Sequence, residues 1–234
     1  MIHFTSGDNK VTIDILYEDS RVIVINKPAG LVMHPKNERD ESSSVFSIFQ
    51  DQLAQNNDLR GGIVHRLDKD TSGVVIMAKD EPALEFLQAQ FANREVDKTY
   101  LALVWGHLSH PKARIELPVR RSLKSPNLMA VHPTGKMSVS QYEVLTEYLD
   151  YSYLSVNIHT GRTHQIRIQF AHIGHPVVGD KLYGKRTMPD GLQRQFLHAK
   201  KLSLILPGEK QKKTFEAPLP AELSSFLKGL AWAS

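Results

Sequence analysis

A short apolar run at residues 74–78, Val-Val-Ile-Met-Ala, constrains this chain more than any other segment. It is apolar at every position and rich in β-branched residues, which is typical of a strand buried on both faces of a sheet. The turn before it, residues 65–72, is by contrast almost entirely polar and is followed by Gly73. No packing requirement accounts for such a turn, so Asp68, two residues after Arg66, is a candidate reactive carboxylate. Taken alone, an Arg-x-Asp pair would more often belong to an ordinary solvated turn.

The composition limits the classes of chemistry. The chain has 234 residues, of which 41% are hydrophobic, so it is long enough to bury a sizeable core. It contains no cysteine, which excludes disulfides, thiolate nucleophiles and cysteine-bound zinc or iron–sulfur sites. Residues 1–10 lack the apolar segment of a signal peptide, and no run approaches the roughly 20 apolar residues of a membrane span. We therefore expect a cytoplasmic protein without a membrane partner.

Charge is distributed unevenly along the chain. Residues 1–150 contain 17 Lys and Arg against 20 Asp and Glu, whereas residues 151–234 contain 12 against 5. A basic C-terminal third favours a polyanionic partner on that side of the molecule, with ordinary charge variation as the alternative. A basic loop at residues 120–125, Arg-Arg-Ser-Leu-Lys-Ser, is either a solvated hairpin tip or a contact to phosphates.

Strands and helices both recur along the sequence without the regular alternation of a βαβ winding. Residues 98–105 are expected to form a strand that is apolar apart from Lys98, Thr99 and the Tyr100 hydroxyl, and alternation places Tyr100, Ala102 and Val104 on one face. We expect an α+β fold with a mixed, mostly antiparallel sheet and flanking helices, in a single domain over residues 1–234. Further strands are expected at residues 11–17, 21–26, 113–119, 128–132, 137–146, 151–159 and 197–206, and helices are expected to start near residues 44, 80, 160 and 221.

A second polar segment with a glycine lies at residues 160–167, Thr-Gly-Arg-Thr-His-Gln-Ile-Arg, and opens the third of these helices. Ile166, Phe170 and Ile173 share one face of that helix, so we expect all three to pack inward. Gly174 follows at the position of a C-terminal helix cap, which predicts that the helix ends near residue 173.

The two polar segments suggest one site. If residues 61–73 and the start of this helix face one cleft, Arg167 would hold Asp68 ionised through a charge-assisted pair. A carboxylate fixed in this way acts as a nucleophile or as a base. Tyr100 offers a ring for stacking and a hydroxyl, or is simply a core tyrosine. Asp70 is a second carboxylate, for which we favour a hydrogen bond within the turn.

Metal and nucleotide-binding patterns are missing from the sequence. His159, His164, His172 and His175 lie close together, but none belongs to a His-Glu-x-x-His helix pattern and no cysteine assists them. The phosphate-binding loop Gly-x-x-x-x-Gly-Lys-Ser/Thr and the dinucleotide fingerprint Gly-x-Gly-x-x-Gly after a strand are also missing. The sequence therefore predicts neither a metal nor a nucleotide cofactor.

Several segments, taken in order, resemble the signature motifs of the RluA-type pseudouridine synthases. The central one is residues 65–73, His-Arg-Leu-Asp-Lys-Asp-Thr-Ser-Gly, which resembles the catalytic motif of that family. The resemblance covers roughly residues 12–220 but does not include the family's N-terminal RNA-binding domain of the S4 type, so we expect a form lacking it. The other matching segments are residues 26–31, Asn-Lys-Pro-Ala-Gly-Leu; residues 98–102, Lys-Thr-Tyr-Leu-Ala; residues 160–167 with His-Pro-Val-Val-Gly-Asp at 175–180; and residues 197–199, Leu-His-Ala.

This resemblance implies an isomerase that converts uridine in structured RNA, ribosomal or transfer, to pseudouridine. The N1–C1′ bond would break, the uracil would rotate while bound, and the ring would rejoin the sugar through C5. Because substrate and product are isomers, no metal, cofactor or energy source is implied. The family fold is a mixed, mostly antiparallel sheet with flanking helices and a central catalytic cleft. The implied partner is RNA, not DNA, and a monomer is expected.

The resemblance also implies roles for individual residues. Asp68 matches the catalytic aspartate, Tyr100 the tyrosine that stacks on the target base, and Arg167 the basic partner of the aspartate. Arg66 matches a position that helps to hold the flipped nucleotide out of the RNA stack. Whether Asp68 attacks C1′ or removes a sugar proton to give a glycal is left open by the sequence. The same motifs place further expected substrate-binding residues at His65, Thr71, Arg162 and His164.

Two other functions remain as alternatives. A non-catalytic RNA-binding protein, such as an RNA-folding chaperone, would use the same scaffold, but the intact Asp68, Tyr100 and Arg167 argue against it. A glycoside or nucleoside hydrolase using Asp68 and Asp70 would release a free base or sugar, which a synthase does not. The sequence does not specify the target RNA, and the loops expected to select it are residues 36–44, 106–113, 120–136 and 184–194.

Overall fold

The computed structural model divides the chain into two compact units, each with its own core. The first unit comprises Met1–Asp97 and Ala199–Pro218, and the second comprises Lys98–His198 and Leu219–Ser234. The expected single domain over the whole chain stays a prediction beside this division. The structure describes residues 2–6, 9–35, 43–54, 61–126 and 128–233.

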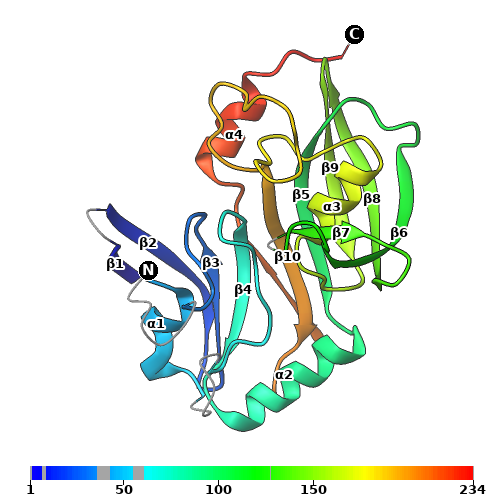
Figure 1. Cartoon of the computed structure of the whole chain (residues 1–234). Helices are drawn as coiled ribbons and strands as arrows, with labels where there is room; N and C mark the ends of the chain where they lie inside the picture. Colours follow the sequence, from blue (N-terminus) through cyan, green and yellow to red (C-terminus); the bar gives the residue numbers. More distant parts are fainter. Residues whose placement is uncertain (1, 7–8, 36–42, 55–60, 127, 234) are drawn as a thin grey trace. The chain divides into compact units, whose positions relative to one another are not determined.

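The first unit contains an antiparallel meander of four strands, β1 to β4, with β10 next to β4 and β11 paired to β10 (Figure 1). The expected apolar run is confirmed as a fully buried strand, because every residue of β4 is buried. Gly73, in β4, has a φ of +124°, and a Cβ there would lie 2.2 Å from the carbonyl oxygen of Ala199. A larger residue therefore cannot pass β10 at this point without backbone movement. The strands are β1 (Ile2–Ser6), β2 (Asn9–Glu18), β3 (Val22–Lys27), β4 (Ser72–Ala78), β10 (Leu197–Ile205) and β11 (Lys212–Glu216).

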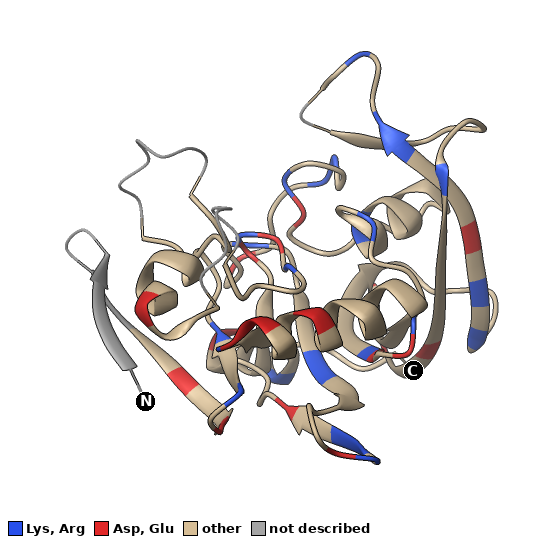
Figure 2. Ribbon diagram, turned by 90° about the horizontal axis from the view of Figure 1, so that it is seen from below, with Lys and Arg blue, Asp and Glu red and all other residues tan. Residues whose placement is uncertain are grey.

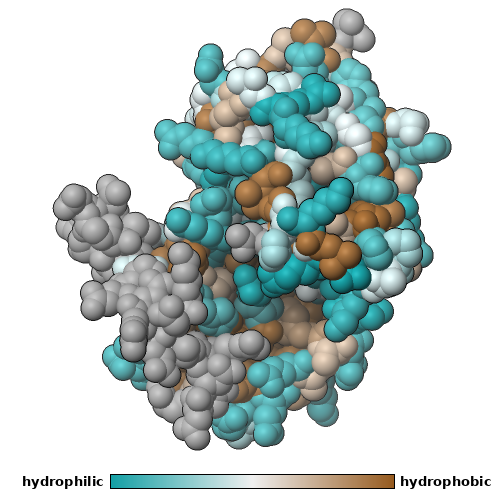
Figure 3. Space-filling model, viewed as in Figure 1, coloured by the Kyte–Doolittle hydropathy of each residue, from teal (hydrophilic) through white to brown (hydrophobic). Residues whose placement is uncertain are grey.

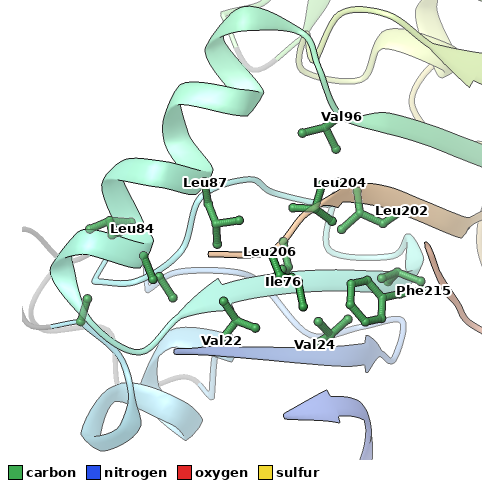
Figure 4. Packing of buried hydrophobic residues seen from close by; sticks show 14 of the residues in the cluster. Val22, Val24, Ile76, Leu84, Leu87, Val96, Leu202, Leu204, Leu206 and Phe215 are labelled. Carbon is green, nitrogen blue, oxygen red and sulfur yellow. The ribbon is translucent and has the colours of Figure 1, made fainter. Parts of the chain in front are cut away.

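Helix α2 (Glu81–Asn93) covers the core of this unit. It begins at Asp80, whose carboxylate accepts a hydrogen bond from the Ala83 N–H, and it ends at Arg94 in a left-handed conformation. Figure 4 shows Leu84 and Leu87 of α2 directed at side chains from the strands, all within one buried apolar cluster. Both ends of this helix are close to the expected residues, because the capping signals are local.

The second unit contains five antiparallel strands in the order β5, β9, β8, β6, β7 (Figure 1). The predicted alternation along β5 is confirmed. Ala102 and Val104 belong to a cluster with Phe170, whereas Leu103 belongs to a separate cluster with Phe196. The elements are β5 (Asp97–Trp105), β6 (Lys112–Arg121), β7 (Met129–Val131), β8 (Lys136–Tyr148), β9 (Tyr151–Ile158), α3 (Gln165–His172) and α4 (Ala221–Lys228).

The α+β class is confirmed. Strand β1 was not among the expected strands, and the other differences noted here lie at element ends. Helix α1 (Val45–Phe49) starts at the predicted Ser44 cap but gives way at once to a 3₁₀ turn, η1 (Gln50–Gln52). Ile173 is 37% exposed, so its predicted inward packing is wrong; α3 ends one residue before it. Residues 36–42 of the loop expected at residues 36–44 lie outside the described residues. Within the described part of the chain, no helix is long and apolar enough to cross a membrane.

Candidate active site

In the first unit, the polar turn leads directly into β4. Leu67 and Thr71 are buried, whereas Arg66 is exposed and Asp68 is half-buried. The Thr71 N–H donates a hydrogen bond of 3.1 Å to the Asp68 carbonyl, which closes a tight turn around the two residues between them. Leu67 and Thr71 therefore anchor the turn, and Arg66 and Asp68 stay at least partly accessible.

A buried lysine supports this turn from below. Lys27, the last residue of β3, is completely buried, and its ammonium group donates hydrogen bonds to three carbonyl oxygens, those of Pro28, Leu31 and Lys69. The Gly30 N–H donates to the same Lys69 carbonyl at 2.9 Å. Lys27 thereby ties the turn after β3 to the residue that follows Asp68. In the sequence, Lys27 lies within the motif at residues 26–31, but no role was expected for it.

We expect Lys27→Met to destabilise the protein by about 3 kcal/mol, because the isosteric side chain leaves buried carbonyl oxygens without their donor. Urea unfolding would measure this loss. Lys201→Met is the matched control, since Lys201 is an exposed lysine of the same unit, paired with Glu216. That change should cost less than about 1 kcal/mol. Equal losses in the two variants would contradict a special role for the buried ammonium group.

His65 has an internal role in the structure. Its Nε2 accepts a hydrogen bond of 3.1 Å from the Ile76 N–H of β4, so the proton of the neutral ring lies on Nδ1. The ring also stacks on Phe91 of α2, with centroids 4.8 Å apart. His65 thus fixes the start of the turn against β4 and α2. Its expected contact with substrate stays a prediction.

In the second unit, a buried polar network joins the start of α3 to β8. The Gln165 amide donates to the Val139 carbonyl and to Ser140 Oγ, and its oxygen accepts from the hydroxyl of Thr160 and the N–H of Arg162. All of these distances are 3.1 Å or less. A saturated network of this kind holds a buried helix end in one orientation. It fixes the direction in which the next polar residue, Arg167, leaves the helix.

Arg167 forms a buried, bidentate ion pair with Asp180. Its Nε lies 2.7 Å from Oδ2 and its Nη2 lies 2.9 Å from Oδ1, and the two side chains are only 5% and 0% exposed. Asp180 Oδ1 also accepts hydrogen bonds from the N–H groups of Leu182 and Tyr183. The pairing of Arg167 with Asp68 expected from the sequence stays a prediction, whereas the pairing with Asp180 was not expected. The available signal was Asp180 itself, the one carboxylate in the motif that follows α3.

The environment of Asp180 has a consequence for acid stability. Burial alone would raise the pKa of its carboxyl group, but the hydrogen bonds and charge of Arg167, with the two backbone N–H groups, outweigh burial and lower that pKa. A carboxyl group whose pKa is lower in the folded state adds stability above its unfolded pKa, about 3.9, and loses it as the pH falls through the folded value.

We therefore expect the free energy of unfolding to fall with acidification below about pH 4 more steeply in the wild type than in Asp180→Asn. Urea titrations of both proteins between pH 3 and pH 7 would measure the two slopes. The Asn variant is the less stable protein at neutral pH, and the difference should narrow as the pH decreases. A constant difference across this range would show that Asp180 does not carry the charge assigned to it.

The remaining predicted residues of the second unit occupy two places. Tyr100 lies on β5 opposite Val156 of β9, half-buried and packed on the apolar cluster beneath it. Arg162 and His164 flank the start of α3, where His164 has a φ of +56° and shares a hydrogen bond of 2.8 Å with the Tyr183 hydroxyl. These positions bring His164 and Arg167 together around Tyr183. Asp68 belongs to the first unit, whereas Tyr100 and Arg167 belong to the second. That these three residues share one active site is therefore a proposal.

Two of the four histidines that raised a metal alternative have other side-chain partners. His175 Nδ1 lies 2.9 Å from the carbonyl oxygen of Trp105, and His164 is bonded to Tyr183. Among the residues that the structure describes, no group of three or more His, Asp or Glu side chains is placed to hold a metal ion.

The basic loop forms the tip of the β6–β7 hairpin. Figure 2 shows basic residues at the end of β6 and in the loop after it. Arg120 donates a hydrogen bond to the Thr134 hydroxyl, and Arg121 donates one to the Pro126 carbonyl. Leu123, in the loop that follows, is 74% exposed. On the described part of the face seen in Figure 3, hydrophobic side chains lie in small areas among hydrophilic ones. Such a surface suits a charged partner better than a broad apolar one.

Comparison with known proteins agrees with the motifs. The family model described as "RNA pseudouridylate synthase" matches residues 21–172. An uncharacterized RNA pseudouridine synthase, YlyB, of Bacillus subtilis is 38% identical over 93% of this chain and 73% of its own length. The ribosomal large subunit pseudouridine synthase D of Yersinia pestis is 35% identical over 94% of this chain and 71% of its own length. The resemblance stated from the sequence is thereby confirmed.

A solved structure shows the same fold. Human RNA pseudouridylate synthase domain containing 1 aligns with 95% of this chain and 97% of its own, with a TM-score of 0.72 at 23% identity. The fold class expected from the sequence is thus found in a protein whose sequence has diverged widely. The family model spans more than half of this chain, and the bacterial relatives match it over nearly its whole length. The chain therefore belongs to the RNA pseudouridylate synthase family and is an isomerase that acts on RNA.

Proposed function

We propose that this enzyme converts a uridine of large-subunit ribosomal RNA to pseudouridine, with Asp68 as the catalytic carboxylate. The observation that carries the assignment of Asp68 is the built support of its turn. The buried ammonium group of Lys27 holds the carbonyl of Lys69, and the Thr71 N–H holds that of Asp68 itself. The choice of RNA rests on the relatives named for the ribosomal large subunit, which match nearly the whole chain.

The reaction rearranges one nucleoside and consumes nothing. The N1–C1′ bond breaks, the uracil turns within the site and a C5–C1′ bond forms. The hydrogen at C5 then leaves as a proton, and N1 takes up a proton, so that the product is an isomer of the substrate. Asp68 serves as an ionised carboxylate in both routes, whether it attacks C1′ or takes a sugar proton. Arg167 would favour the ionised form of Asp68 through the positive charge of its guanidinium group.

The target nucleotide has to leave its stack before C1′ and C5 can be reached, which costs a few kcal/mol. Stacking of the uracil on Tyr100 would return about 1–3 kcal/mol of this. Tyr100 suits the role because its half-buried ring is held on β5 by the apolar cluster beneath it. Arg66 is exposed on the Asp68 turn, so it would occupy the space that the base vacates in the RNA.

The basic hairpin supplies contacts to phosphates in this proposal. Arg120 and Arg121 are already oriented by hydrogen bonds to their own hairpin, and Lys124 lies at its exposed tip. Contacts of this kind release counterions, so RNA affinity should fall steeply with salt. They position the RNA without reading its sequence.

Tritium release from RNA labelled at C5 of uridine tests the proposal, with large-subunit ribosomal RNA and transfer RNA in separate reactions. Release from the ribosomal RNA alone is the expected result. Release from transfer RNA alone would overturn the assigned substrate but keep the chemistry. Tight, salt-dependent binding without release from either RNA would instead support the RNA-folding alternative.

A further inference from the structure

Tyr183 lies at the centre of the contacts that surround Arg167. Its ring centroid is 5.3 Å from the guanidinium carbon of Arg167, and its backbone N–H donates to the Asp180 carboxylate at 3.1 Å. Its hydroxyl accepts a hydrogen bond of 3.0 Å from the Met129 N–H and shares one of 2.8 Å with His164 Nδ1. One residue thus contacts the arginine, its counter-ion, the residue before α3 and strand β7: the ring and hydroxyl reach Arg167, His164 and Met129, and the backbone N–H reaches Asp180.

These contacts restrain the guanidinium group in ways that Asp180 alone does not. The bidentate pair fixes two nitrogen atoms of Arg167 against the carboxylate. The Tyr183 ring lies on the guanidinium group as a second contact, and a cation is attracted to the face of such a ring. The two hydrogen bonds to the hydroxyl then hold the ring itself in place, because they come from different elements, α3 and β7.

We propose that Tyr183 is a positioning residue for Arg167. The Tyr183 ring contacts the guanidinium group, and the Tyr183 hydroxyl, through its hydrogen bond from Met129, connects this arginine to the β6–β7 hairpin. This inference rests on the proposed function, in which Arg167 orients and stabilises the catalytic carboxylate. The hairpin carries the basic residues proposed to contact phosphates, and Met129 is the first residue of β7. RNA that binds to the hairpin would therefore contact the same hairpin whose Met129 N–H donates a hydrogen bond to the Tyr183 hydroxyl.

The chain itself offers a matched control. Tyr142 of β8 also belongs to the second unit and also packs on α3, with its ring 5.6 Å from that of Phe170. Its hydroxyl donates a hydrogen bond of 3.3 Å to the carbonyl of His110, so it too has a single oxygen that Phe would remove. Tyr142 has no part in the site proposed here. The two Tyr→Phe changes are equal in chemistry and differ in whether the ring faces Arg167.

The experiment measures kcat and KM for Tyr183→Phe and Tyr142→Phe with C5-labelled ribosomal RNA, together with the melting temperature of each protein. We expect Tyr183→Phe to lower kcat about 10- to 100-fold with KM changed less than threefold. The reason is that a displaced Arg167 guanidinium group slows the chemical step but leaves the binding of RNA largely unchanged. Tyr183→Leu, which also removes the ring, should lower kcat further. Tyr142→Phe should lower the melting temperature by a similar amount and leave kcat unchanged.

Two outcomes would overturn the inference. Equal kcat in Tyr183→Phe and the wild type would show that the hydroxyl does not position the arginine. Equal losses in both Phe variants would show a general effect of loosening α3. Arg167→Lys, assayed in parallel, separates this result from the proposed function. Full turnover by Arg167→Lys would contradict the role of Arg167 itself. Lost turnover in Arg167→Lys, together with full turnover in Tyr183→Phe, would contradict only the role of Tyr183.

Discussion

Asp68→Asn is expected to reduce isomerisation below detection, by at least about 10³-fold, while the affinity for RNA stays within about threefold. The substitution keeps the size and the hydrogen-bonding oxygen of the side chain and removes only its charge. Asp68 is half-buried and its backbone, not its carboxylate, closes the turn with Thr71, so the fold should tolerate the change. Tritium release at saturating RNA and a filter-binding titration would separate the two effects.

Asp70→Asn is the matched control for this prediction, because the same change is made two residues away in the same half-exposed turn. It should retain most of the turnover. A hydrolase that used both carboxylates would lose activity in both variants and would release free uracil from the RNA in its wild-type form. Turnover by Asp68→Asn above a trace would remove Asp68 from the catalytic role.

Local signals in the sequence were enough to predict most of the elements. The Asp80 cap with its following proline placed the start of α2, and the uninterrupted apolar run placed β4. Alternation along β5 correctly separated its two buried faces. In each case the cause of the structure lies within a few neighbouring residues, so the pattern carries the information.

The parts of the site that were missed depend on contacts between distant segments. Lys27 binds a carbonyl 42 residues away, and Tyr183 bonds to Met129, 54 residues away. The residues around Lys27 and Tyr183 in the sequence do not indicate these contacts. A lysine is usually expected at the surface, and a tyrosine after a turn is usually expected to pack in the core. For His65 the motif suggested a contact with substrate, which stays a prediction, but it gave no sign of the hydrogen bond to Ile76, which exists only in the folded chain.

Arg167→Met should be the most destabilising of the substitutions considered, by about 3–5 kcal/mol, because it leaves Asp180 as a buried carboxylate without its cation. The main cost falls on Asp180, whose side chain is completely buried. The same variant should lose at least about 10²-fold in turnover, because a charged group held at the catalytic carboxylate contributes that much.

A double variant separates these two effects of Arg167. Arg167→Met with Asp180→Asn removes both charges but keeps an oxygen to accept the N–H groups of Leu182 and Tyr183. Replacing both partners avoids the uncompensated charge, so the double variant should regain a large part of the stability that Arg167→Met loses. Turnover should not return, because the guanidinium group needed by Asp68 is still missing. If turnover returned with stability, Arg167 would act only as the counter-ion of Asp180, and another group would have to hold the catalytic carboxylate ionised.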